Sequence, residues 1–396
     1  FLFAGGEEGL TATPVWQAGS DQKGSRFGTA VDSAGDVNGD GYADVLIGAY
    51  RYADGLLEAE EGRLYLYPGS ADGPAAAASW MAESDQRLAH LGYAVAFADV
   101  NSDGYADVLA GAPGYGDGGA LFLYLGSAAG LSAAPDQIIT GAQANARFGM
   151  VVAAAGDVDA DGYTDVIVGA PFWDGAYEHA GAAFLYLGSA AGLAESSAWQ
   201  VVGDNQYAQL ATAVTGLGDV NNDGFDDVAV GAPGFIDPVT GAAGAATAYF
   251  GHTGGLTGFP MWTARGGSDP GGFGSALTAA DLNGDACPDL IVGAPLFSGD
   301  QSAEGAAFVY PGEGGTLAAT PASRMEGNKA DTDFGRALSA GLSRGGACAA
   351  RTWGEDSSPS RSLGLSRLSG ISGSSPERTT RRSSSFSSSR TLPGQW

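Results

Sequence analysis

Short apolar runs separated by turn residues recur along most of the chain. Each run holds four to eight residues and is rich in Val, Ile, Tyr and Phe, as in 64–67 and 184–187. Runs of this length and composition favour β-strands over helices. Gly, Pro, Asp and Asn stand between the runs and are typical of tight turns. The pattern therefore predicts an all-β protein built from short strands.

The runs belong to a unit that repeats five times. Its most regular part is a nine-residue acidic loop that starts at Asp36, Asp99, Asp157, Asp219 and Asp281, so successive copies lie 63, 58, 62 and 62 residues apart. An aromatic residue or Leu, usually followed by Gly, lies eight or nine residues before each loop, and Gly-Ala-Pro follows four of the loops. Four short strands in about 60 residues, repeated in register, predict the blades of a β-propeller. A β-sandwich would not repeat one loop at a fixed period.

Oxygen-bearing side chains alternate within each acidic loop. Positions 1, 3 and 5 are Asp or Asn, position 6 is Gly in four copies, and position 9 is always Asp. Calcium takes roughly six to eight oxygen ligands, and alternate residues of a tight loop place their side chains on one concave side. Gly at position 6 permits a left-handed turn, after which the carbonyl of position 7 can face inward. The predicted ligands are Asp36, Asn38, Asp40, Tyr42 and Asp44; Asp99, Asn101, Asp103, Tyr105 and Asp107; Asp157, Asp159, Asp161, Tyr163 and Asp165; Asp219, Asn221, Asp223, Phe225 and Asp227; and Asp281, Asn283, Asp285, Cys287 and Asp289.

Two other structures could account for acidic loops of this kind. An EF-hand needs a Glu at position 12 and flanking helices, whereas position 12 of the first loop is Ile47, inside an apolar run. The loops could also be Asp/Asn turns without a metal. Three or four carboxylates in one loop repel one another unless a cation lies between them, and the same arrangement recurs five times. Calcium is favoured over Mg²⁺, which keeps more water, so up to five Ca²⁺ sites are expected and chelation should lower the melting temperature.

The five loops differ in ways that predict different affinities. The third loop carries four acids, with Asp159 in place of the usual Asn, and we expect it to hold calcium tightly. The fifth has Ala286 at the Gly position, and a positive φ at Ala costs roughly 1 kcal/mol or more. This site is expected to be the weakest. In the fourth loop an additional acid, Asp226, is expected to be a solvated charge.

The repeated motifs resemble the FG-GAP repeat family, the blades of integrin α-subunit β-propellers and their bacterial relatives. The resemblance rests on Phe27-Gly28, Phe148-Gly149 and Phe273-Gly274, on the acidic loops at 36, 99 and 157, and on the Gly-Ala-Pro triplets. It covers residues 1 to about 340. The resemblance implies a ring of four-stranded blades, usually seven, with calcium in the loop between the first two strands of a blade. This chain would hold five complete units with partial units at both ends.

The expected organisation has three parts. Residues 1–26 are the C-terminal strands of a partial blade, and 27–340 are propeller blades whose units start near 27, 91, 148, 210 and 273, with a truncated unit at 334. Residues 341–396 form a low-complexity tail in which 16 of 56 residues are Ser and 8 are Arg, and we expect it to be disordered. Because the change falls in mid-motif, a frameshift is one hypothesis and a natural Ser/Arg-rich tail is the other.

The net charge of the chain narrows the range of its possible functions. The formal net charge is −27, which disfavours nucleic acid and anionic membrane surfaces, and no apolar run is long enough to span a bilayer. No residue is assigned to catalysis or to an organic cofactor. The first hypothesis is therefore an extracellular calcium-binding propeller that binds a protein or glycan, as in adhesion. Its secreted or cell-surface location rests on the abundance of calcium outside cells and on the resemblance.

Two other functions remain open. One is a non-catalytic propeller domain of a larger secreted enzyme of the phospholipase or lyase type, for which a catalytic domain should be encoded upstream. The other is a propeller enzyme with its own central site, which would need unit-breaking polar residues at the ring centre. The unit-specific aromatics Trp173, Tyr177 and Phe235 follow the Gly-Ala-Pro turns and are candidates either for a binding face or for ordinary packing.

Overall fold

The computed structural model describes residues 1–6, 9–33, 35–54, 59–267 and 271–339. Within these ranges every regular element is a β-strand, which confirms the all-β prediction. The expected tail, and the hypotheses about its origin, lie outside the described residues.

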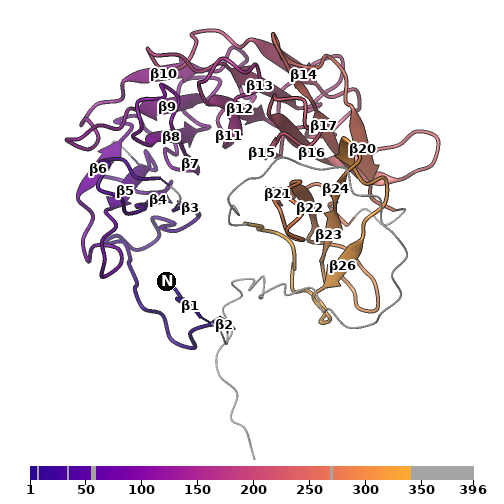
Figure 1. Ribbon diagram of the computed structural model, residues 1–396, viewed down its shortest axis with the longest axis horizontal. Coiled ribbons are helices and arrows are strands. Elements are labelled where there is room, and N and C mark those ends of the chain that lie inside the picture. The colour runs from indigo at the N-terminus through magenta and orange to yellow at the C-terminus, as the bar shows by residue number, and fades with distance from the viewer. Residues whose placement is uncertain (7–8, 34, 55–58, 268–270, 340–396) are drawn as a thin grey trace, which may run out of the picture.

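Five antiparallel sheets of four strands follow one another along the chain (Figure 1). Blade 1 is β3 (Ala30–Asp32), β4 (Val45–Ala49), β5 (Arg63–Tyr67) and β6 (Trp80–Glu83). Blade 2 is β7 (Ala94–Ala98), β8 (Asp107–Ala112), β9 (Ala120–Tyr124) and β10 (Gln137–Thr140). Blade 3 is β11 (Val151–Gly156), β12 (Asp165–Ala170), β13 (Ala182–Tyr186) and β14 (Trp199–Val202). Blade 4 is β15 (Ala213–Gly218), β16 (Asp227–Ile236), β17 (Ala243–Tyr249) and β20 (Trp262–Arg265). Blade 5 is β21 (Ala276–Ala280), β22 (Asp289–Ala294), β23 (Ala306–Tyr310) and β26 (Ser323–Glu326).

Three two-stranded hairpins complete the described strands. They are β1 (Gly5–Gly6) with β2 (Gly9–Leu10), β18 (Gly251–His252) with β19 (Gly255–Leu256), and β24 (Gly312–Glu313) with β25 (Thr316–Leu317). Before blade 1, Leu2 also forms an antiparallel bridge with Trp16.

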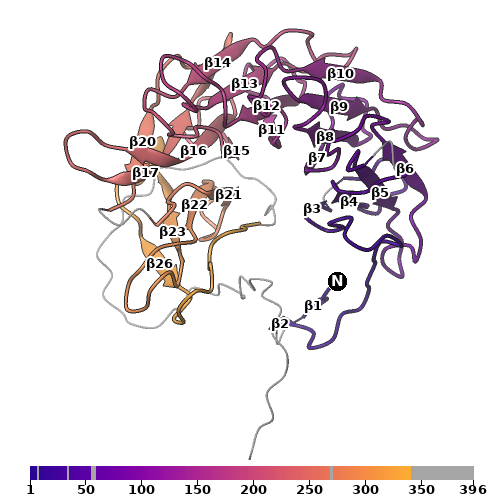
Figure 2. The same ribbon diagram turned by 180° about the vertical axis from the view of Figure 1, so that it is seen from behind.

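The blades stand around a common centre with their first strands innermost (Figures 1 and 2). Along the chain, the first strand of each blade contacts the first strand of the next. The described blades form an open arc. This arrangement confirms a β-propeller architecture, and it places all five acidic loops between the first and second strands of their blades, as expected.

The aromatic-Gly and Gly-Ala-Pro motifs meet where two blades join. In the units that start at Leu91, Phe148, Leu210 and Phe334, the aromatic or Leu residue forms a parallel bridge with a Gly of the preceding blade, as Phe148 does with Gly119. The glycine of the preceding Gly-Ala-Pro lies against the next pair, because a Cβ at Gly111 would collide with the carbonyl oxygen of Gly149. The two motifs therefore recur together because each needs the other for close approach of the blades.

A tryptophan joins neighbouring blades at four places. Each indole meets a tyrosine ring edge-on at 4.9–5.1 Å and donates its N–H to a backbone carbonyl 52–59 residues further along at 2.8–3.0 Å. The pairs are Trp16 with Tyr67, Trp80 with Tyr124, Trp199 with Tyr249, and Trp262 with Tyr310. Between blades 2 and 3 the equivalent residue is Gln137, whose Nε2 donates to the carbonyl of Leu193 at 2.9 Å.

Candidate metal centres

The carboxylate at position 1 organises each acidic loop. In the second loop, Asp99 accepts the backbone N–H of Asp103 at 3.1 Å and that of Gly104 at 3.0 Å. The same two bonds, at 2.7–3.2 Å, occur in the other four loops. Position 5 then accepts the N–H of position 7, as Asp103 does from Tyr105 at 3.0 Å. These bonds fold the backbone around the acids.

The closing aspartate at position 9 is the buried member of each loop. Asp44, Asp107, Asp165, Asp227 and Asp289 are all 0–1% exposed. Each accepts one N–H from position 2 of its own loop and one from the glycine just after the third strand, at 2.8–3.0 Å. The closing acid therefore fastens the loop to the sheet.

Burial dominates the electrostatics of these closing acids. It raises the pKa of Asp107, Asp165 and Asp227 to about 7 and that of Asp289 to about 6, against an ordinary value of 3.8. The two backbone N–H groups oppose this rise in pKa, and the other acids of the loop add to it. The loops thus hold ionisable oxygens where a negative charge is unfavourable without a nearby cation.

The third loop brings three carboxylates together. One oxygen from each of Asp157, Asp159 and Asp165 lies within 4.8 Å of the others. The Oδ1 atom of Asp159 is buried and makes no hydrogen bond, and burial, followed by Asp161 and Asp157, raises the pKa of Asp159. In the first, second and fourth loops the residue at this position is Asn, which donates to the acid at position 5 at 2.8–3.1 Å. An aspartate cannot make that bond, so its oxygen is left for another partner.

The oxygen donors of this loop fit a hard divalent cation. Calcium prefers carboxylate ligands. A calcium ion would offset the negative charges of Asp157, Asp159 and Asp165, whose oxygens converge here, and would give the buried Oδ1 of Asp159 a partner. Asp161 lies outside that closest group. Its Oδ1 accepts the N–H of Tyr163 at 3.0 Å. Ligation by the carbonyls of position 7, and by the remaining predicted residues of the other loops, stays a prediction.

The fifth loop has the strained backbone that its sequence predicts. Ala286 has φ +71°, where the other loops have Gly at +87° to +94°. Its N–H still reaches Asp281, at 2.9 Å. Sequence reasoning missed that position 4 is also left-handed in every loop, including Ser102, Ala160 and Asn222 at +54° to +59°. The small or Asn residues at this position were the available signal.

Asp226 has a different role from the solvated charge expected of it. Its Oδ2 accepts the backbone N–H of Asp157 at 2.9 Å, and its own N–H donates to the carbonyl of Asp157 at 3.0 Å. Gly156, at a bulge of β11, makes room for this carboxylate, because a Cβ there would collide with it. Asp226 is a half-buried link between the third and fourth loops.

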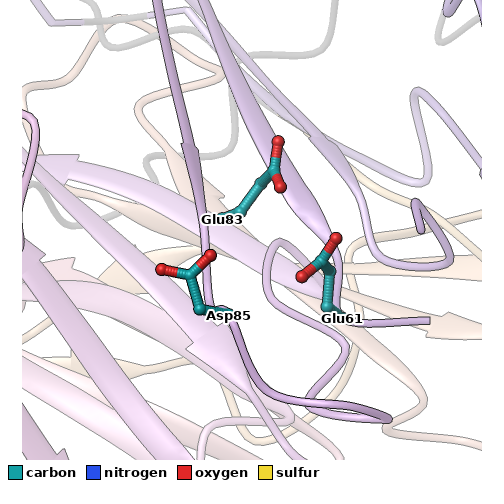
Figure 3. Close-up of side chains that lie close together, drawn as sticks. All are labelled: Glu61, Glu83 and Asp85. Atoms are coloured by element: carbon teal, nitrogen blue, oxygen red, sulfur yellow. The ribbon is translucent and has the colours of Figure 1, made fainter. Parts of the chain in front are cut away.

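A second acidic group lies in blade 1 and was not anticipated. Glu61, Glu83 and Asp85 lie close together (Figure 3), with one oxygen of each within 4.8 Å of the others. Arg63 forms an ion pair with Glu83 and stacks over the ring of Tyr52 at 3.4 Å. Because Arg63 already supplies a positive charge, the group has a structural explanation as an ion-pair cluster.

Comparisons with known proteins agree with the repeat. The FG-GAP repeat profile matches residues 148–186, 211–249 and 273–310, and the FG-GAP-like repeat profile matches 36–110. Integrin alpha-V of Gallus gallus is 34% identical over 222 residues, which are 52% of this chain and 20% of that protein. Integrin alpha-5 of Xenopus laevis is 30% identical over 238 residues, 55% of this chain and 21% of that protein.

A relative outside the integrins also matches. Phosphatidylinositol-glycan-specific phospholipase D of Bos taurus is 34% identical over 218 residues, 50% of this chain and 25% of that protein. The aligned segments span about a fifth to a quarter of these three relatives. None of the described residues forms a helix with the length and apolar character needed to cross a bilayer. With matching repeat profiles, integrin α relatives and a propeller architecture, the chain contains FG-GAP repeats and is similar to the integrin α-like β-propellers.

Proposed function

We propose that this propeller is an extracellular, calcium-stabilised module that binds a protein or glycan ligand, as adhesion propellers do. The observation that carries the calcium part is the third loop, where three acids converge and Asp159 Oδ1 is buried without a hydrogen bond. The binding part is supported by similarity to integrin α subunits. Location outside the cell is supported by the same similarity and by the abundance of calcium there.

The role of the metal follows from where the loops lie. Bound calcium would supply positive charge to the loop acids. Each closing acid also ties its loop to the sheet through two N–H bonds, as Asp165 does at 2.9 Å to Val158 and to Gly188. The loop acids therefore link the ionic state of the loop to the packing of the blade. We infer that calcium stabilises the fold and carries no catalytic step.

Calcium titration followed by thermal unfolding tests the metal claim. Adding calcium to chelated protein should raise the melting temperature in a saturable way, because a ligand that binds only the folded state stabilises it. Magnesium at the same concentration is the control and should act more weakly. An unchanged melting curve between excess chelator and excess calcium would remove calcium from the proposal.

Ligand binding needs a separate measurement. The immobilised protein should retain a component from panels of extracellular-matrix proteins or glycans in calcium and lose it in chelator. A second candidate function is a non-catalytic domain of a larger secreted enzyme, which the similarity to the bovine phospholipase D favours. The sequence of the surrounding gene decides between them, because an adjoining catalytic domain would support the enzyme alternative.

A further inference from the structure

The boundary between blades 2 and 3 has no indole at the position where Trp16, Trp80, Trp199 and Trp262 lie in the other units. Gln137 reaches the carbonyl of Leu193 at 2.9 Å, in place of an indole N–H. It brings no ring, so Tyr186 has no indole partner of the kind that Tyr124 finds in Trp80 at 4.9 Å. The hydrogen bond across the boundary is kept while the aromatic contact is lost.

A cavity of about 530 Å³ lies at this boundary. The side chains of Phe148, Phe184 and Tyr186 line it from the apolar side. Gln137 lies along the same cavity, and the exposed residues Glu195 and Gln200 contribute polar groups. The cavity therefore joins an aromatic wall to a polar mouth.

The aromatic side chains of blade 5 have the same arrangement as those that line this cavity in blade 3. There, Phe273 meets Phe308 at 5.4 Å and Tyr310 at 6.4 Å. In blade 3, Phe148 meets Phe184 at 5.6 Å and Tyr186 at 6.0 Å.

The outer ring of the wall is matched as well. Trp173 packs on Phe184 at 5.2 Å, and Phe297 packs on Phe308 at 5.8 Å. In blade 5 the indole of Trp262 then meets Tyr310 at 5.0 Å. The aromatic walls of the two blades correspond, and the residue that differs in the indole position is Gln137.

We propose that this cavity binds the indole ring of a tryptophan side chain presented by a polypeptide ligand. The ring would meet Tyr186 edge-on, as the four internal indoles meet their tyrosines. In the lining, the carboxylate of Glu195 offers an acceptor for the indole N–H. The carbonyl of Leu193, which already accepts from Gln137, keeps a second lone pair beside the cavity residue Gln137. One of the sequence's unit-specific aromatics, Trp173, thus has a place in a binding site.

The surroundings of the cavity favour a polypeptide over a free indole. All four residues of β10 line it, and β10 is the outermost strand of blade 2, paired in its sheet with β9. An edge strand presents backbone N–H and C=O groups to an incoming chain. The exposed Gln200 and Ser196 offer further hydrogen bonds to peptide groups at the mouth.

This inference rests on the proposed ligand-binding role, but its readout is separate from the calcium titration. Calcium binding to the acidic loops is measured by the change in melting temperature on chelation. Binding to the cavity is measured as the affinity for an indole probe at saturating calcium. Either claim can therefore fail while the other stands.

The test uses N-acetyl-L-tryptophanamide as the probe, titrated calorimetrically into the full chain. It should bind at least tenfold more tightly than N-acetyl-L-leucinamide and more tightly than free indole. Gln137→Trp should fill the cavity, weaken probe binding at least tenfold and raise the melting temperature. Gln200→Arg should block the mouth from an exposed position, whereas Gln17→Arg, the same change at an exposed residue before blade 1, should bind like the wild type.

The mirror variant Trp262→Gln should create a second site of the same kind in blade 5. Absence of probe binding by the wild type would overturn the proposal, as would equal affinity of the wild type, Gln137→Trp and Gln200→Arg. Free indole binding as tightly as the amide would overturn the polypeptide source.

Discussion

The carboxylate of Asp226 accepts the backbone N–H of Asp157 across the boundary between blades 3 and 4, at 2.9 Å. Asp157 is position 1 of the third acidic loop, so a residue of the fourth loop holds the start of the third. Asp226 therefore lies beside a predicted metal ligand, but its carboxylate binds the backbone of that residue and is not itself a predicted ligand.

Replacing Asp226 separates its hydrogen bond from its charge. Asp226→Ala should destabilise the protein by about 1–3 kcal/mol, because a half-buried N–H loses its acceptor. Asp226→Asn keeps an acceptor oxygen and should lose less than half of that. Urea unfolding at saturating calcium measures both. Equal losses would show that the charge, and not the hydrogen bond, is what matters.

Asp159 distinguishes the third loop from the others. Asp159→Asn gives it the residue that the first, second and fourth loops carry, and Asn there can donate to Asp161 as Asn101 donates to Asp103. The fold should persist, while the calcium affinity proposed for this loop should fall at least tenfold because one carboxylate is removed from the group. Calcium titration by calorimetry measures the change. Asn101→Asp is the reverse variant and should tighten the second site; five equal sites in the wild type would contradict the ranking.

Ala286 offers a gain of stability. Ala286→Gly should stabilise the protein by about 1 kcal/mol, because residue 286 has φ +71° and glycine has no Cβ to disfavour this left-handed conformation. Calcium affinity of the fifth loop should rise with it. Gly41→Ala, at φ +88° in the first loop, is the opposite change and should cost about as much. Thermal unfolding of the two variants should therefore shift in opposite directions.

The buried closing acids predict an unusual pH dependence for the calcium-free protein. The pKa of Asp107, Asp165 and Asp227 is about 7 in the folded state and near 3.8 when unfolded. The folded state then binds more protons between these values, so the free energy of unfolding should fall as pH rises from about 4 to about 7. In chelator the melting temperature should be lower at pH 7.5 than at pH 5. With calcium saturating at pH 7.5, most of that loss should be recovered; a chelated protein that is more stable at pH 7.5 would contradict the assignment of burial as the cause.

The blade boundary predicts a large effect from a small substitution. Gly111→Ala should destabilise the protein by about 1–3 kcal/mol or more, because its Cβ would meet the backbone carbonyl of Gly149, which cannot move aside alone. Gly258→Ala is the control, since that glycine is exposed and has open space around it. Chemical denaturation should separate the two variants clearly.

How far the sequence predicts this molecule depends on whether a feature repeats. The spacing of the acidic loops predicted one loop per blade because five copies keep one register, and the resemblance to FG-GAP repeats implied their place between the first two strands. The role of Asp226 was not predictable in the same way, since its partner Asp157 lies 69 residues away and the other loops have no acid at this position. Burial of the closing acids by the third strand also depends on tertiary packing.

The cavity between blades 2 and 3 is an intermediate case. Tryptophan lies 11 residues before four of the aromatic-Gly pairs, and the same count back from Phe148 reaches Gln137. The interruption was visible in the sequence. Its consequence was not, because only the structure shows that Gln137 keeps the hydrogen bond to Leu193 and leaves Tyr186 without an indole.

Parallel bridges to the preceding blade, such as that from Phe148 to Gly119, connect each of the bridged blades to its neighbour along the chain. Each blade is stabilised by its own sheet and by the blade beside it. Loss of one boundary should therefore divide the arc into two cooperative segments that melt separately. The same logic means that a whole unit could be inserted or removed at such a boundary, with the remaining acidic loops keeping their own sheets.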